Sequence, residues 1–333
     1  MHAKRWLASL LLVLPGLATA ADVCGDFARK LQSSSYGDRI AGVACHESLL
    51  WYRPFIDREG RLASITLTEA ESGQLSDGTP AWQRVAAYWR GSGLLWQVQQ
   101  RPDASACTVA TPGSWQSASC RAFVLDTPWS AAFLSFVMSR AGVPGFRISG
   151  SHIDYVRDAY RRPESSPYRL VEPTSLPAAP GDLLCFVRSP TRVFGYAGLR
   201  QFLEGGEVGL AMHCDLVVAN NAGGDGLLSL IGGNVLQGVT QRQLTVNREG
   251  LLWNLPLRSG ADPYCAPHAP AGCNFNRQDW VALLKLIALP PAAAPVPPLG
   301  DTPALQQRCC VNCVLGADPP VPRCPRPELS DMP

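Results

Sequence analysis

The sequence predicts an α+β protein in which helices pack on an antiparallel sheet. Two helical patterns, at 128–141 and 149–162, precede four short apolar segments bounded by turn residues. Helices followed by a run of strands, rather than strict alternation, are typical of this class. Hydrophobic residues make up 46% of the 333 residues and charged residues 17%, which suits a packed core. The formal net charge is only +2 and long basic runs are absent, so nucleic acid is not expected as a partner.

Residues 1–20 have the pattern of an export signal. "MHAKRW" supplies positive charge, "LASLLLVLPGL" is a short apolar stretch, and "ATA" ends it with small residues. The apolar stretch is too short for a permanent transmembrane helix, and no later segment has about 18 uninterrupted apolar residues. We therefore expect a bacterial periplasmic or secreted protein without stable membrane insertion once the signal is removed.

The twelve cysteines suit an exported protein, because disulfides persist in oxidising compartments. Cys107 and Cys120 flank a turn-rich stretch, and a bridge there would add roughly 3 kcal/mol of stability in the chain-entropy model. Cys24 with Cys45, and Cys265 with Cys273, are further expected pairs. In the tail, "CCVNC" at 309–313 and Cys324 suit two more bridges, with a zinc site that includes His268 as the alternative. Bridges are favoured, so neither a metal nor a cofactor is expected.

Residues 21–120 form an N-terminal region whose role the sequence leaves open. A helix is predicted within 79–96, with Thr79 as its cap, Pro80 in its first turn and an apolar stripe that includes Trp82 and Trp89. The alternating segment 61–72 predicts a strand. The region could be a separate domain, an inhibitory flap or part of a common core.

Residues 121–260 are expected to form the working domain. Thr127 should cap the helix at 128–141, and Ser149 or Ser151 the helix at 149–162. The four strands are predicted within 179–188, 209–221, 226–235 and 239–246. The long loop 188–209 suits a cleft rim.

Residues 261–333 should contain a helix at 275–289, a stiff extended linker at 290–303 and a cysteine-rich tail.

Three residues of the working domain have the chemistry of a nucleophilic hydrolase. Ser130 begins a helix, where free backbone N–H groups can stabilise a developing oxyanion. A serine needs a base to take its proton, and His213 on a predicted strand is the expected base. A third group must orient the histidine, and Asn234 and Asp215 are the two candidates. Asp215 points to the same strand face as His213, whereas the intervening Cys214 points away.

Four further residues are expected around the substrate or the oxyanion: Trp129, Ala131, His152 and Arg188. The backbone near Ala131 would help to hold the oxyanion. His152 either lines the cleft beside Ser130 or only caps and packs its own helix. Arg188 either meets a substrate carboxylate or lies on a solvated loop.

The motifs "TPWSAAF" (127–133), "PGDLLCF" (180–186), "HCDLVV" (213–218) and "IGGNV" (231–235) resemble an uncharacterised bacterial family, domain of unknown function 2272. That family is similar to CHAP amidases and NlpC-like cell-wall peptidases, and the resemblance covers about 121–245. It implies a papain-like fold with Ser130 at the nucleophile, His213 at the base and Asn234 at the orienter. In those enzymes the nucleophile is a cysteine, so the serine is a departure.

The leading functional hypothesis is an exported hydrolase that cleaves an amide or an ester. The resemblance implies a peptidoglycan peptide, or another cell-envelope molecule, as the substrate. A non-catalytic envelope-binding module and a structural or interaction protein are the alternatives. The sequence leaves the oligomeric state undetermined.

Overall fold

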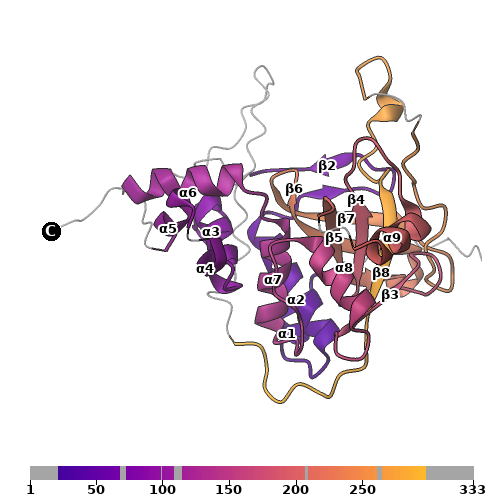
Figure 1. The fold of residues 1–333 in the computed structure, drawn as a ribbon, viewed down its shortest axis with the longest axis horizontal. Coiled ribbons are helices and arrows are strands. Elements are labelled where there is room, and N and C mark those ends of the chain that lie inside the picture. The colour runs from indigo at the N-terminus through magenta and orange to yellow at the C-terminus, as the bar shows by residue number, and fades with distance from the viewer. Residues whose placement is uncertain are drawn as a thin grey trace, which may run out of the picture.

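The computed structural model describes residues 22–67, 73–98, 100–108, 115–206, 209–260 and 265–297. The expected signal at 1–20 and the cysteine-rich tail lie outside these residues. In the described part, helices cover one face of an eight-stranded sheet (Figure 1). The helices are α1 (Phe27–Leu31), α2 (Tyr36–Leu50), α3 (Ala81–Gly91), α4 (Leu95–Val98), α5 (Pro102–Ala106), α6 (Trp115–Asp126), α7 (Ser130–Ala141), α8 (His152–Arg161) and α9 (Gly195–Glu204).

The sheet is open and mixed, in the order β2-β1-β7-β6-β5-β4-β8-β3. All neighbouring strands are antiparallel except β1 and β7, which are parallel. The strands are β1 (Phe55–Ile56), β2 (Leu62–Ser64), β3 (Tyr168–Val171), β4 (Leu183–Val187), β5 (Met212–Asn220), β6 (Leu227–Val235), β7 (Gly238–Thr245) and β8 (Asp279–Leu286). The four predicted strands are β4 to β7, and they lie side by side in chain order. The α+β class is confirmed, and the sheet is larger than the sequence predicted.

The prediction of a helix at 275–289 is wrong, because this segment contains strand β8, which lies between β4 and β3. The apolar run from Trp280 to Leu284 is buried throughout, since both faces of the sheet are covered at this position. A short continuous apolar run has neither a helical nor an alternating period, so its pattern does not distinguish a buried strand from a helix.

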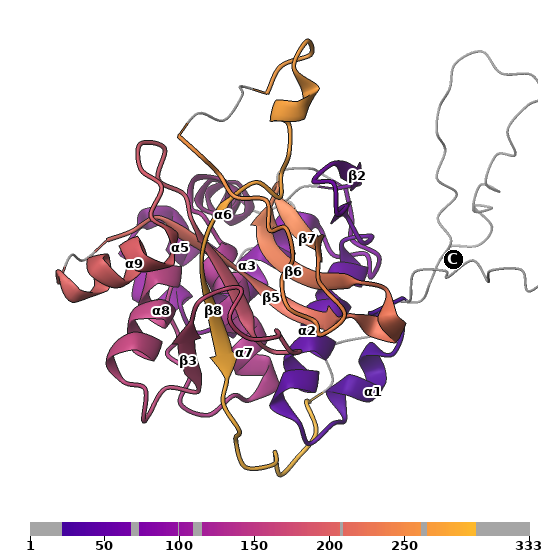
Figure 2. The same ribbon diagram turned by 90° about the vertical axis from the view of Figure 1, so that its right-hand side faces the viewer.

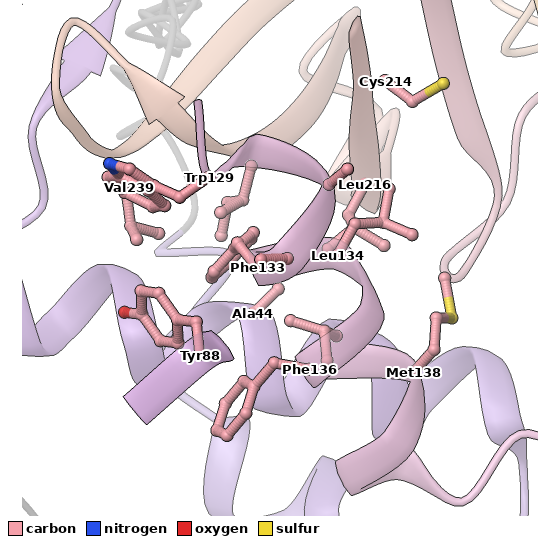
Figure 3. Close-up of a cluster of buried hydrophobic side chains, with 14 of the residues drawn as sticks. Ala44, Tyr88, Trp129, Phe133, Leu134, Phe136, Met138, Cys214, Leu216 and Val239 are labelled. Atoms are coloured by element: carbon pink, nitrogen blue, oxygen red, sulfur yellow. The ribbon is translucent and has the colours of Figure 1, made fainter. Parts of the chain in front are cut away.

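The two faces of the sheet pack against different partners. On one face α2, α7 and α8 contact the strands, and Figure 3 shows Phe133 and Leu134 of α7 beside Leu216 of β5. On the other face a smaller core includes Phe186, Leu230 and Trp280. Successive residues of a strand alternate between these two cores, as the pleat requires.

The N-terminal region shares the main core with the rest of the chain. Trp51 and Tyr88 pack against Trp129, with ring centroids 5.9 and 5.6 Å away (Figure 3). The Tyr88 hydroxyl donates to the Glu47 carboxylate at 2.8 Å, and Arg84 pairs with both oxygens of that carboxylate. Trp129, the residue that precedes α7, is therefore fixed by packing against Trp51 at the end of α2 and Tyr88 of α3.

Two helix starts differ from the predicted caps, while the N-cap residue of α8 is Ser151, one of the two predicted alternatives. Helix α3 begins after Pro80 rather than at Thr79, and α7 begins after Trp129 rather than at Thr127. Ser151 is the first flanking residue of α8, but its side chain forms no capping hydrogen bond. Packing of Trp129, rather than a side-chain cap, fixes the start of α7.

The loop expected at 188–209 contains a helix, α9, that packs against β8. The N–H groups of Phe194 and Gly195 at its start donate to the buried carboxylate of Asp279. The strand predicted at 61–72 is limited to β2, and part of that segment lies outside the described residues.

Four disulfides join described cysteines, and three of them are the predicted pairs: Cys24–Cys45, Cys107–Cys120 and Cys265–Cys273. The fourth, Cys185–Cys214, links facing residues of β4 and β5. These bridges are consistent with an oxidising extracellular or periplasmic location.

After β8 the chain returns to the N-terminal helices (Figure 2). The Ala292 amide donates to the Ser34 carbonyl and the Val296 amide to the Leu31 carbonyl. Val296 is buried in the main core, so this extended segment packs on the domain.

In the described part of the chain, each helix alone is too short or too polar to cross a bilayer. Helices α6 and α7 are long and apolar enough only when they are taken together, and a bend of 102° separates them.

We predict that Glu47→Gln destabilises the fold by about 3–5 kcal/mol, because it leaves Arg84 buried without its counter-charge. Burial alone would raise the pKa of Glu47, but the positive charge of Arg84 outweighs it and holds that pKa at about 2. The stabilisation is therefore complete above the ordinary carboxyl pKa and is lost as the pH falls from about 4.5 toward about 2.

Urea unfolding at pH 7 and pH 3 measures both effects. Exposed Glu172→Gln is the matched control and should change the unfolding free energy by less than about 0.5 kcal/mol. Equal stability of the two variants at pH 7 would contradict the role of Glu47.

Candidate functional site

The hydroxyl of Ser130 is hydrogen-bonded to a histidine at the start of the neighbouring helix. Ser130 Oγ lies 2.8 Å from Nε2 of His152. Ser130 is the first residue of α7 and His152 the first residue of α8. Their exposed fractions are 6% and 4%, so the pair is largely screened from bulk water.

Ser130 also lies beside the free backbone donors of its own helix. The Phe133 amide donates to the Trp129 carbonyl and closes the first turn. The amides of Ser130, Ala131 and Ala132 therefore precede the first intrahelical hydrogen bond. They carry the partial positive charge of the helix N-terminus, which can stabilise an anion formed at the serine.

The environment of His152 keeps its ring neutral. Burial lowers the pKa of His152 well below its ordinary value of 6.5, and the neighbouring His213 and Arg188 lower it further, while Asp215 opposes them. Its other ring nitrogen, Nδ1, is buried and has no hydrogen-bond partner among the described residues. A neutral imidazole can accept the Ser130 proton, but within the described part of the chain no third group forms a hydrogen bond that fixes this ring.

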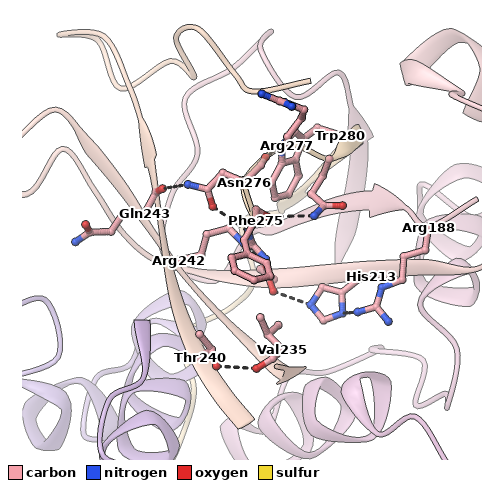
Figure 4. Close-up of polar contacts among 12 residues, drawn as sticks. Arg188, His213, Val235, Thr240, Arg242, Gln243, Phe275, Asn276, Arg277 and Trp280 are labelled. Carbon is pink, nitrogen blue, oxygen red and sulfur yellow. Dashed lines mark hydrogen bonds and ion pairs between the residues drawn. The ribbon is translucent and has the colours of Figure 1, made fainter. Parts of the chain in front are cut away.

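His213 belongs to a second polar cluster, on β4, β5 and β7. Its Nε2 lies 2.7 Å from Oδ1 of Asp215. Its Nδ1 lies 2.8 Å from a nitrogen of Arg188, and Figure 4 shows these two side chains side by side. A guanidinium only donates, so Nδ1 is the acceptor and Nε2 carries the proton. Burial lowers the pKa of His213, and Asp215 acts against that shift. His213 is therefore a neutral ring with both nitrogens occupied.

Asp215 is the anion of this cluster. Its second oxygen accepts from Nε of Arg242 at 3.0 Å. Burial favours the neutral acid, but His213 and Arg242 outweigh it and hold the pKa of Asp215 at about 2. Arg242 also donates from Nη1 to Oδ1 of Asn276 and to the Phe275 carbonyl (Figure 4).

The serine thus meets His152 and not the predicted His213. His213 faces Phe186 across β4 and β5, which places it on the sheet face opposite to α7. The two imidazoles approach at the strand end, with ring centroids 5.1 Å apart. Of the alternatives for His152, the cleft position beside Ser130 is the one observed.

The two candidate orienters lie in different surroundings. Asp215 contacts His213 directly, and the predicted shared strand face of the two residues is confirmed. Asn234 lies near the end of β6, where the register with β7 shifts between Gly232 and Val235, and has φ +56°, a backbone conformation that asparagine tolerates. It lines a pocket with Arg188 and Arg242.

Gly232 on β6 keeps the space beside His213 and Asp215 open. A Cβ atom there would lie 1.9 Å from Asp215 Oδ1 and 3.0 Å from His213 Nε2. The glycine pair of "IGGNV" is thus needed for packing, since a Cβ on Gly233 would overlap Phe133.

The remaining predicted residues have separate places. Trp129 is buried between Trp51 and Tyr88, so its side chain supports α7. Ala131 offers its amide at the helix start, and its carbonyl accepts from the Tyr155 hydroxyl. Arg188 contacts His213 as described.

Sequence reasoning missed Arg242. Its only signal in the sequence is its place in "VTQRQLTV", where strand alternation puts residue 242 on the same face as the apolar Leu244. A buried arginine needs a carboxylate, and Asp215 is that partner.

The fold and site define an α+β protein with a buried serine and histidine pair at two helix starts. A family model described as "Uncharacterized protein conserved in bacteria (DUF2272)" matches residues 76–286. The chain belongs to that family. No curated protein and no solved structure matches the chain.

We predict that Gly232→Ala disrupts the His213 cluster and costs roughly 1–3 kcal/mol, because its methyl group would overlap the Asp215 carboxylate. Thermal unfolding and the NMR signals of the His213 ring are the measurements. Gly260→Ala is the control, since a Cβ there meets nothing within 4 Å. An unperturbed His213 signal in Gly232→Ala would refute the described packing.

We predict that His152 stays neutral well below pH 6.5 in the folded protein, because burial disfavours its cation. Below about pH 6.5 the His152 ring is protonated in the unfolded state but stays neutral in the folded state. This residue therefore makes the free energy of unfolding fall as the pH drops below about 6.5. NMR titration of the ring signal, assigned with His152→Gln, measures the pKa. A folded-state pKa at or above 6.5 would contradict this prediction.

Proposed function

We propose that the protein is an acyl hydrolase in which Ser130 is the nucleophile and His152 the general base. The observation that carries the proposal is the 2.8 Å hydrogen bond between Ser130 Oγ and His152 Nε2. A serine hydroxyl is a weak nucleophile until a base within this distance can take its proton. His152 replaces His213 in the predicted role.

The reaction would proceed in two acyl-transfer steps. Ser130 Oγ bonds to the substrate carbonyl carbon while its proton passes to Nε2 of His152. The bond to the leaving amine or alcohol then breaks, and the leaving group takes the proton from Nε2. Water repeats the sequence on the acyl-serine, which releases the acid and restores the hydroxyl.

Two features of the surroundings would stabilise the transition state. The first-turn amides of α7, from Ala131 onward, are the donors for the oxyanion. The Asp215 carboxylate favours the His152 cation that forms during attack, as its opposing effect on that pKa indicates. Arg188 and His213 disfavour the same cation, so the protonated base would give its proton readily to the leaving group.

The substrate class rests on resemblance. The motif order resembles that of CHAP and NlpC-like enzymes, so we propose a papain-like arrangement that acts on an amide of a peptidoglycan peptide. An ester in the cell envelope is the alternative bond, because serine nucleophiles suit esters at least as well.

A second candidate is a non-catalytic envelope-binding module. The observation that favours it is Nδ1 of His152, which forms no hydrogen bond with any described residue. In serine hydrolases a third group at this atom holds the ring in its active tautomer.

We predict that a fluorophosphonate probe labels Ser130, and that the purified chain releases products from muropeptides or simple esters, detected by mass spectrometry. Ser130→Ala should abolish both. His152→Gln should slow labelling by roughly 100-fold or more, the usual contribution of a general base.

The matched control is Ser139→Ala, an exposed serine of the same helix, which should react like the wild type. Loss of labelling in His213→Gln but not in His152→Gln would reassign the base. Absence of both labelling and turnover in the folded wild type would favour the binding module.

A further inference from the structure

A pocket of about 330 Å³ opens on the sheet face that carries His213. Three arginines contribute to its lining: Arg188, Arg242 and Arg258. They come from the end of β4, from β7 and from the segment that precedes β8, so the folded sheet gathers them from distant parts of the sequence.

The pocket has a surplus of positive charge. Arg242 is neutralised by Asp215, which lies behind it. Neither Arg188 nor Arg258 forms an ion pair with a described carboxylate, and no described lining residue is acidic. Arg258 donates to the Arg192 carbonyl and Arg188 to a neutral ring nitrogen, so neither charge is neutralised by a direct ion pair within the described residues. Burial lowers the pKa of Arg188 and the charge of Arg242 adds to this effect, with Asp215 opposing both.

The walls add apolar and aromatic surface to this charge. The Arg188 and Arg242 guanidinium carbons lie 5.8 and 5.9 Å from the ring centroid of Phe186. Phe275, which is 39% exposed, also lines the pocket and could cover a ligand. Arginines beside flat apolar surfaces suit an organic anion better than a free inorganic ion, because the organic part can cover the rings.

The pocket is connected to the serine through a short series of contacts. Arg188 bonds to His213, the His213 ring lies 5.1 Å from the His152 ring, and His152 bonds to Ser130. A ligand that is held by the arginines therefore has its charged end a few side chains from the nucleophile.

We propose that this pocket binds the carboxylate end of an organic ligand, with Arg188 and Arg258 as its charge partners. The inference rests on the proposed function only where it calls this ligand the substrate. A guanidinium donates two parallel hydrogen bonds to a carboxylate, which gives both affinity and orientation.

The test measures binding to Ser130→Ala, so that turnover does not interfere. The probes are two N-acetyl dipeptides that end in alanine or phenylalanine, each as the free acid and as the C-terminal amide. We expect at least one acid to bind roughly 10-fold more tightly than its amide, as an added charge-assisted contact allows. Calorimetry at low and high salt gives the affinities, and the difference should shrink at high salt.

Arg258→Gln should remove most of the preference for the acid, whereas Arg248→Gln should preserve it, because Arg248 is exposed and outside the pocket. Arg188→Gln is a second pocket variant, with thermal unfolding as the check that each variant folds. Equal binding of acids and amides, no binding of any acid, or an unchanged preference in both pocket variants would overturn the proposal. Inorganic phosphate that binds more tightly than every acid would overturn it in favour of a phosphate site.

These outcomes separate the two proposals. A carboxylate preference in a protein whose Ser130 resists labelling would leave the pocket standing and remove the hydrolase. Labelling of Ser130 without any carboxylate preference would support the hydrolase and remove the carboxylate pocket.

Discussion

The buried carboxylate of Glu47 is the constraint on which the start of α7 depends. It pairs with Arg84, accepts from the Tyr88 hydroxyl, and through Tyr88 fixes the aromatic residues around Trp129. Trp129 is adjacent to Ser130, so an ion pair in the N-terminal region sets the position of the candidate nucleophile. A buried charge pair tolerates little rearrangement, because separating its members costs several kcal/mol. The N-terminal helices are therefore a structural part of the site.

The site contains two polar clusters that meet at the end of β5. Ser130 and His152 form a neutral pair under the helices, while Asp215 and Arg242 form an ion pair on the opposite sheet face. His213 lies between them and, with both nitrogens engaged, stays neutral. The strand end is the only place where side chains from opposite faces can approach, because the backbone separates them elsewhere. The charge of Asp215 can thus influence His152 without a direct hydrogen bond.

The local patterns of the sequence predicted much of this structure. Strands β4 to β7 and helices α7 and α8 follow from periodicity and turn residues, and three disulfides follow from cysteine spacing. Strand β8 was missed because burial on both faces removes the alternation that identifies a strand. The base was assigned to His213 for a related reason, although a position of His152 beside Ser130 was one of the predicted alternatives. Strand periodicity puts His213 and Asp215 on one face, but it does not tell which face the helix covers. Only the long-range pairing of Arg242 with Asp215 and of Phe186 with Trp280 decides that.

Strand β8 occupies the interior of the sheet, between β4 and β3, although it is the last of the described strands in chain order. The segment that follows it then packs on the N-terminal helices, with Val296 buried in the main core. A ribosome would have made nearly the whole chain before these contacts could form, so the early part must wait with its apolar surfaces unpaired. Late, long-range closure slows folding and lengthens the time during which the chain remains extended. That delay is compatible with a route in which the polypeptide is threaded through a narrow channel first and acquires its tertiary structure afterwards.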